Sequence, residues 1–182
     1  PACDESECPT NATALGNGVR LVNLVATVTN NSGTSQEIVI PRGQTFTSVD
    51  TAYQDGMAAE RLQGTIGPGA TRTFVLYVFC INLDRGIPPT GALYLPGPVT
   101  GNAQLLDIAS LADGKIGVAA DPGTLKAGGV QMAIWEVTDG LGSLNTTQRN
   151  LLVSLLAAAP DDIAGQALLL DQLLASLTIF AP

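Results

Sequence analysis

Apolar and polar residues alternate along much of the first half of the chain, a period that is typical of β-strands. Residues 19–29 (VRLVNLVATVT) are rich in β-branched side chains, and the turn signal NNSG separates them from residues 35–41 (SQEIVIP), where the alternation resumes. Two alternating segments joined by a short turn predict a β-hairpin. Residues 61–67 (RLQGTIG) predict a further short strand, whereas residues 42–58 are less regular.

A long apolar segment predicts the central strand of the sheet. Residues 71–81 read TRTFVLYVFCI, and from Phe74 to the end of the segment they are apolar on both faces. Strands that are covered on both faces carry such continuous apolar runs. Because side chains alternate with a period of two, we expect Leu76, Val78 and Cys80 to share one face with Phe74.

The pattern changes near residue 100, where helical periodicity begins. Residues 82–101 contain GIPPTG and LPGPVTG, and we interpret them as a Pro/Gly-rich crossing without a strand. Residues 102–114 predict a helix with an N-capping asparagine and a glycine stop, and residues 130–140 (VQMAIWEVTDG) predict a short helix that ends at a glycine. A further helix begins at Asn145, where Gln148 stands three residues on, as in a capping box.

The last helix predicted, in residues 161–180 (DDIAGQALLLDQLLASLTIF), has two apolar stripes and almost no charged face. A surface helix normally has one apolar stripe, so the strands or a second subunit must cover the other. We therefore expect self-association through the C-terminal helices, residues 145–182. The two stripes consist of Ile163, Ala167, Leu170, Leu174 and Leu177, and of Leu169, Leu173 and Phe180.

Strand patterns followed by helix patterns predict an α+β protein. We expect an N-terminal antiparallel β-sandwich with a disulfide loop in residues 1–100, and a helical C-terminal half in residues 101–182. Hydrophobic residues make up 46% of the chain and charged residues only 13%, against about 25% in an average protein. Such a chain suits close packing in an extracellular filament or surface layer, which heterologous contacts can build.

The charge and the absence of histidine exclude several functions. The net charge is −8 and the chain has no histidine, so Ser-His-Asp catalysis, Cys-His catalysis and His-containing zinc sites are excluded. Without a basic patch, nucleic acid is not expected as a partner. Gln166, Asp171 and Gln172 interrupt the longest apolar stretch, so we expect no membrane span. We expect no metal, no cofactor and no enzymatic turnover, because no general base is evident.

The three cysteines indicate an oxidising compartment. Cys3 and Cys8 bracket the residues DESE, and their closeness predicts a small disulfide loop. A chain that starts at Pro1 without an apolar leader is what a secreted protein looks like after its signal peptide is removed. We therefore expect an extracellular or cell-surface protein. Sequons at Asn11, Asn30 and Asn145 permit glycosylation.

If Cys3 and Cys8 form a disulfide, Cys80 is the one cysteine without a disulfide partner. Gln131 stands in an apolar run shortly before Trp135, the single tryptophan. An aromatic-Cys pair on a strand and a later Gln-x-Ala-Ile-Trp, here VFCIN and VQMAIW, resemble the bacterial thioester domains of surface adhesins. The resemblance implies that Cys80 is the thioester sulfur and Gln131 the acyl donor. It also implies that Phe79 and Trp135 line the site.

The chemistry of a thioester needs these residue types. A thiolate attacks the carboxamide carbon, ammonia leaves, and the resulting thioester is an electrophile that an amine of a partner opens to form a covalent amide. Such a bond survives only where water is excluded, and the apolar strand end of Cys80 and the Trp-bearing helix of Gln131 are suitable walls. The resemblance therefore predicts a module that acts in adhesion by bonding covalently to an amine-bearing surface target.

Two other interpretations remain open. The chain is a purely structural subunit of an extracellular polymer, with the Cys80–Gln131 bond as an internal staple. Alternatively, Cys80 is a buried free thiol and Gln131 a polar core residue whose donors and acceptors are satisfied.

Other candidate sites are weaker. Asp84–Arg85 suits a surface turn better than a site-lining ion pair, and Trp135 and Tyr94 suit core packing better than sugar stacking. Neither DESE nor Asp161–Asp162 has the spacing of a calcium loop, so a solvated acidic face or a helix start is the better interpretation.

Overall fold

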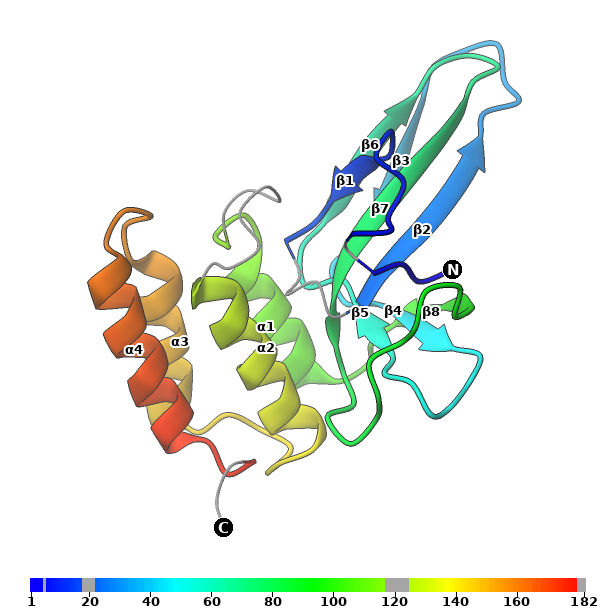
Figure 1. The fold of residues 1–182 in the computed structure, drawn as a ribbon. Coiled ribbons are helices and arrows are strands. Elements are labelled where there is room, and N and C mark those ends of the chain that lie inside the picture. Colours follow the sequence, from blue (N-terminus) through cyan, green and yellow to red (C-terminus); the bar gives the residue numbers. More distant parts are fainter. Residues whose placement is uncertain (5, 18–21, 117–124, 180–182) are drawn as a thin grey trace.

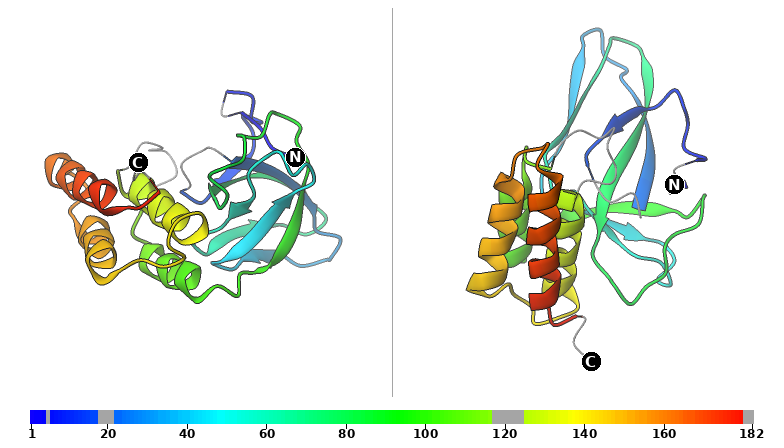
Figure 2. Two further views of the ribbon diagram at one scale, coloured as in Figure 1. Left: turned by 90° about the horizontal axis from the view of Figure 1, so that it is seen from below. Right: turned by 60° about the vertical axis from the view of Figure 1, so that its left-hand side comes forward.

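The computed structural model describes residues 1–4, 6–17, 22–116 and 125–179. Eight strands precede four helices in these residues, so the protein belongs to the α+β class, as predicted. Figures 1 and 2 show the helices gathered on one side of the strands. None of the described helices is long and apolar enough to cross a membrane.

The predicted central strand is confirmed as β7 (Thr71–Cys80), which at 10 residues is the longest strand described. It pairs in parallel with β1 (Thr13–Leu15) and antiparallel with β2 (Val22–Thr29). Its last two residues pair with β5 (Gly56–Met57). The side chains from Phe74 to Cys80 are buried except at Tyr77, which explains the apolar run in the sequence.

The predicted hairpin between residues 19–29 and 35–41 is wrong. β2 pairs with β7, whereas β3 (Gln36–Ile40) pairs with β6 (Leu62–Ile66) in a separate two-stranded sheet. The alternating pattern identifies a strand and its buried face but does not identify the partner strand. Figure 1 shows the β2–β3 and β6–β7 connections side by side at the far end of the strands. Apolar side chains from both sheets belong to a single buried cluster.

Residues 82–101 contain a strand that the Pro/Gly content concealed. β8 (Tyr94–Val99) pairs with β4 (Gln44–Ser48), which in turn pairs with β5 in the less regular region. Pro96 and Pro98 are tolerated because β8 lies at the edge of the sheet, where missing N–H donors cost little. The expectation of a crossing without a strand is therefore corrected.

The side chain of Asn30, which is 6% exposed, ties the two connections together. Its Nδ2 donates to the backbone carbonyls of Thr34 (2.8 Å), Ile66 (3.1 Å) and Gly67 (2.9 Å). This nitrogen is the atom that a glycan would occupy, so the folded chain does not present the Asn30 sequon. The sequons at Asn11 and Asn145 are exposed.

The predicted caps of two helices are confirmed. α1 (Ala103–Ala112) begins after Asn102, whose side chain accepts from the first turn of the helix. α3 (Thr146–Ala157) begins after Asn145, and Gln148 completes the capping box. Each cap satisfies backbone N–H groups that have no partner within the helix.

α2 (Leu125–Thr138) is longer than the predicted helix of residues 130–140 and is buried on most of its surface. Lys126, which is 7% exposed, donates from Nζ to the carbonyls of Leu156 (3.0 Å) and Ala158 (2.6 Å) at the end of α3. A cation at a helix C-terminus is favourable because the last carbonyls carry partial negative charge. The lysine therefore caps a neighbouring helix from within the core.

A buried carboxylate on α2 holds the chain that follows α4 (Ile163–Ser176). Glu136 has no exposed surface and accepts from the N–H (2.9 Å) and hydroxyl (2.7 Å) of Thr178 and from the N–H of Ile179 (3.2 Å). Gln148 donates to the same carboxylate at 3.3 Å. A buried charge must be hydrogen-bonded in this way to be tolerated.

The two stripes predicted on the last helix are only partly buried within the chain. Leu173 and Leu177 are buried, whereas Ile163 is 61% exposed and Leu168, which belongs to neither stripe, is 58% exposed. Phe180 lies outside the described residues.

Two apolar clusters meet where α2 contacts the end of β7. The helical cluster includes Met57 of β5, Phe79 of β7 and Ala59, which follows β5. The cluster shared by the two sheets includes Trp135 from α2. Each cluster thus contains side chains from both the helices and the strand region. This shared packing fixes the helices against the sheet at the end of β7.

We predict that Asn30→Ala lowers the free energy of unfolding by about 1–3 kcal/mol, because buried carbonyls lose their donor. Asn31→Ala is the matched control, since Asn31 is exposed and directly follows. Urea denaturation of both variants measures the difference. Equal stability of the two variants would contradict the role assigned to Asn30.

Candidate functional site

The structure brings Cys80 and Gln131 together, although they are 51 positions apart in the chain. Cys80 is the last residue of β7, and Gln131 lies in the middle of α2. The backbone N–H of Cys80 donates to Oε1 of Gln131 at 2.9 Å, and Nε2 of Gln131 donates to the carbonyl of Cys80 at 2.8 Å. Both ends of the carboxamide are therefore fixed against one residue.

The carboxamide takes the place of a neighbouring strand. Cys80 is opposite Gly56 in β5, and the ladder to that side continues from the N–H of Ile81 to the carbonyl of Asp55 at 3.1 Å. Backbone groups of successive residues in a strand point to opposite sides, so those of Cys80 point away from β5. The amide of Gln131 meets them there, as a peptide group of an adjacent strand would.

Both residues are completely buried, with no exposed surface on either. Burial raises the pKa of the Cys80 thiol to about 12, because a thiolate loses its hydration there. The thiol is therefore protonated at neutral pH. A reaction at this site must move the thiol proton, and the chain has no histidine to receive it.

Trp135 and Phe79, the two predicted wall residues, belong to apolar clusters on different faces of β7. Trp135 follows Gln131 by one helical turn, is 7% exposed and belongs to the same cluster as Cys80. Its indole N–H has no hydrogen-bond partner among the residues that the structure describes. Phe79, 1% exposed, alternates to the other face and packs among the helices. Core packing, the favoured interpretation of Trp135, agrees with this burial.

Tyr94 of β8, which the sequence analysis assigned to core packing, is a neighbour of the Cys80–Gln131 site. Its hydroxyl donates to the carbonyl of Gln54 at 2.5 Å. Burial raises the pKa of Tyr94 to about 12, because a phenolate would lose its hydration there. Tyr94 alternates with the exposed Leu93 and Leu95, a strand signal that the adjacent prolines concealed.

Asp55 connects the chain segments beside the site through hydrogen bonds and an ion pair. Its carboxylate accepts from Nη1 of Arg85 at 3.0 Å and from the N–H of Ser48 at 2.8 Å. Asn82 accepts from the N–H of Asp55 at 2.8 Å. Arg85 thus pairs with Asp55, whereas Asp84 is exposed in a turn. The sequence could not reveal this pair, because its members lie on separate loops.

The remaining candidates have structural roles. The predicted Cys3–Cys8 disulfide is present, and Cys80 is the free cysteine. Asp162 caps α4 by accepting from the N–H of Gly165, as a helix start requires. Within the described ranges, no group of three or more acidic, cysteine or histidine side chains is placed to hold a metal ion.

Comparisons with known proteins add no relative: no family model, no curated protein and no solved structure matches the chain.

We predict that replacing Gln131 by leucine, in a Cys80→Ala background where no thioester contributes, lowers the free energy of unfolding by about 2–5 kcal/mol. Two buried backbone groups lose their partners, each at about 1–3 kcal/mol. Gln104→Leu in the same background is the control, because Gln104 is exposed on a helix, and its effect should stay within about 0.5 kcal/mol. Chemical denaturation with equal midpoints would refute the role of the carboxamide.

Proposed function

We propose that this chain is a secreted bacterial cell-surface protein that carries an internal thioester between Cys80 and Gln131 and acts in adhesion. The observation that supports this most is the pair of hydrogen bonds, 2.9 and 2.8 Å long, that hold the carboxamide against Cys80. A fixed approach of two reacting groups lowers the entropic barrier to their reaction. The two facing sheets are, on this proposal, the β-sandwich of an adhesin module.

Formation of the bond balances without any added reagent. The sulfur of Cys80 attacks the carboxamide carbon of Gln131, the carbon–nitrogen bond breaks, and the thiol proton leaves with the nitrogen as ammonia. The N–H of Cys80 already donates to Oε1, where negative charge develops during the attack. A donor fixed in that position stabilises the tetrahedral intermediate.

Opening of the bond attaches a target. The uncharged amine of the target attacks the same carbon, the carbon–sulfur bond breaks, and a proton from the amine returns to the sulfur as the thiol of Cys80. The product is an amide between Gln131 and the target. Complete burial of both residues supports a long-lived bond, because hydrolysis needs water at the carbon. The module reacts once and does not turn over, so it is not an enzyme.

The disulfide supports the proposed location. Cys3 and Cys8 are joined, and such bonds persist in oxidising environments such as the cell exterior. Exposed apolar side chains favour a second, compatible role as a subunit of an extracellular assembly. Ile163 and Leu168 of α4 are 61% and 58% exposed, and Leu93 and Leu95 beside β4 are 60% and 62% exposed. In that role the Cys80–Gln131 bond is a staple.

The thioester predicts an intact mass that is one ammonia below the sequence mass, after the disulfide is allowed for. Methylamine should add once, and peptide mapping should locate it on Gln131. Cys80→Ala and Gln131→Glu should both have their full calculated masses and add nothing. A wild-type chain of full mass with a thiol that reacts after unfolding rejects the thioester, and Gln131 is then a purely structural amide.

Self-association through the C-terminal helices predicts that Leu168→Asp lowers the average mass measured by light scattering while the helical circular dichroism is unchanged. Leu168 is exposed in the protomer, so a charge there is not buried on folding. Ala175→Asp, also on an exposed position of α4, tests whether any charge on this helix has the same effect. A monomeric wild-type chain at high concentration would disprove the assembly.

A further inference from the structure

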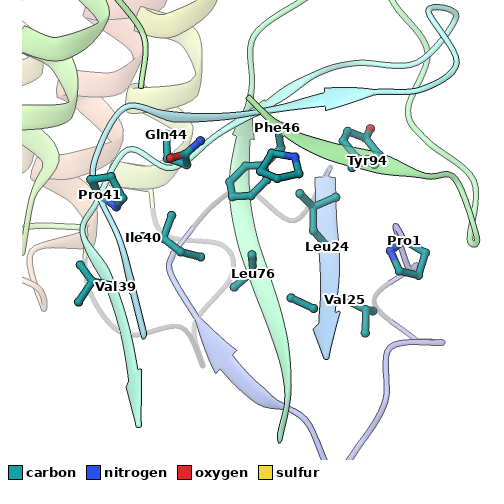
Figure 3. Close-up of a pocket in the computed structure, with 12 residues that line it drawn as sticks. Pro1, Leu24, Val25, Val39, Ile40, Pro41, Gln44, Phe46, Leu76 and Tyr94 are labelled. Carbon is teal, nitrogen blue, oxygen red and sulfur yellow. The ribbon is translucent and has the colours of Figure 1, made fainter. Parts of the chain in front are cut away.

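The complete burial of Cys80 and Gln131 means that an amine reaches them only through a path that opens. An apolar pocket of about 310 Å³ lies near the site and is open to solvent. It lies between β2, the end of β3, and strands β4 and β8 (Figure 3). No acidic or basic side chain lines it. The residues that matter here are Leu24, Ala26, Ile40, Phe46, Leu76 and Tyr94.

The pocket and the thiol lie on the same face of β7. Leu76, in the pocket wall, is followed on that face by Val78 and then Cys80, since side chains alternate along a strand. All three belong to one apolar cluster. Figure 3 shows the rings of Phe46 and Tyr94 together at one end of the pocket. Tyr94 is thus shared between the pocket and the surroundings of Cys80.

Within the described part of the sheet, the strand that carries Tyr94 is paired on one side only. β8 is at the sheet edge and pairs only with β4 among the described strands. Pro96 and Pro98 have no N–H and cannot donate to that ladder. The hydroxyl of Tyr94 holds the ring in place through its hydrogen bond to the carbonyl of Gln54. Loss of this bond removes one restraint on the ring.

We propose that this pocket is the subsite through which the target's amine reaches the thioester, with the alkyl stem of the amine, such as a lysine side chain, against its walls and Tyr94 as the barrier. The inference rests on the proposed thioester. An apolar pocket without charged side chains among its described lining residues accommodates methylene groups, as it would the stem of a lysine. It admits the uncharged amine, which is also the form that attacks a thioester.

The first test compares how fast methylamine and n-pentylamine add to the wild-type chain, at equal concentrations of free base, by intact mass. Burial of the extra methylenes should make n-pentylamine about 10-fold faster. Ala26→Leu, which fills the pocket, should remove this preference and slow the addition of both amines, that of n-pentylamine more than that of methylamine. Ala175→Leu, an exposed control, should retain it. Equal rates for both amines in wild type overturn the proposal.

The barrier is tested by Tyr94→Phe, which removes the hydroxyl and keeps the ring. Both amines should then add faster, whereas Tyr53→Phe, in a loop near the site, should have no effect. A Tyr94→Phe variant with wild-type rates would show that this ring does not control access.

A binding measurement separates the pocket from the thioester. In Cys80→Ala, which has no thioester, n-pentylamine should give saturable amide shifts in NMR spectra at Leu24 and Ala26, and Ala26→Leu should abolish them. If the wild-type mass is one ammonia below the sequence mass but Cys80→Ala shows no saturable binding, the pocket proposal is overturned and the thioester is supported. Saturable binding with a wild-type chain of full mass supports the pocket as an alkyl site and overturns the thioester.

Discussion

A carboxamide that must be satisfied inside the core determines how the two halves of this protein meet. Gln131 has no exposed surface, and its partners are the N–H and carbonyl of Cys80. An unpaired buried polar group is costly, so these bonds set both the rotation of α2 and its height along β7. The apolar clusters on either side follow from that position, because Trp135 is directed toward the sheet while other α2 side chains pack among the helices.

The same contact has opposite consequences before and after ammonia leaves. In the unreacted chain, the nitrogen of Gln131 supplies the donor to the Cys80 carbonyl. On the proposed function, thioester formation would remove that nitrogen and leave a buried carbonyl without this donor, a loss of about 1–3 kcal/mol. The covalent link offsets this by restricting the unfolded chain. The proposed reaction would therefore remove one of the two hydrogen bonds that position it, the one from Nε2 to the Cys80 carbonyl. The other, from the Cys80 N–H to Oε1, would be retained.

Local signals in the sequence predicted local structure well. The apolar run of β7, the caps at Asn102 and Asn145 and the Cys3–Cys8 loop depend on neighbouring residues, and all are present. Pairings between distant segments were not predictable, because a period of two does not name a partner: β2 pairs with β7 and not with β3. The Cys80–Gln131 juxtaposition was the exception, since the chemistry of a thioester requires both. The positions of Tyr94 and Asp55 beside the site were missed because prolines masked one strand and because an ion pair between loops leaves no sequence signal.

The placement of Gln131 on a helix, and of Glu136 five positions later, has a mechanical consequence. Once a target is bonded to Gln131 and the link to Cys80 is open, tension between the target and the chain beyond α4 enters at α2. The tension does not have to pass through α3 and α4, because Glu136 accepts hydrogen bonds directly from Thr178 and Ile179. The force then passes along about one and a half helical turns, from Gln131 to Glu136, and through the hydrogen bonds of Glu136, which share the load. The sheets and the disulfide lie outside this path and remain unstrained while the attachment is pulled.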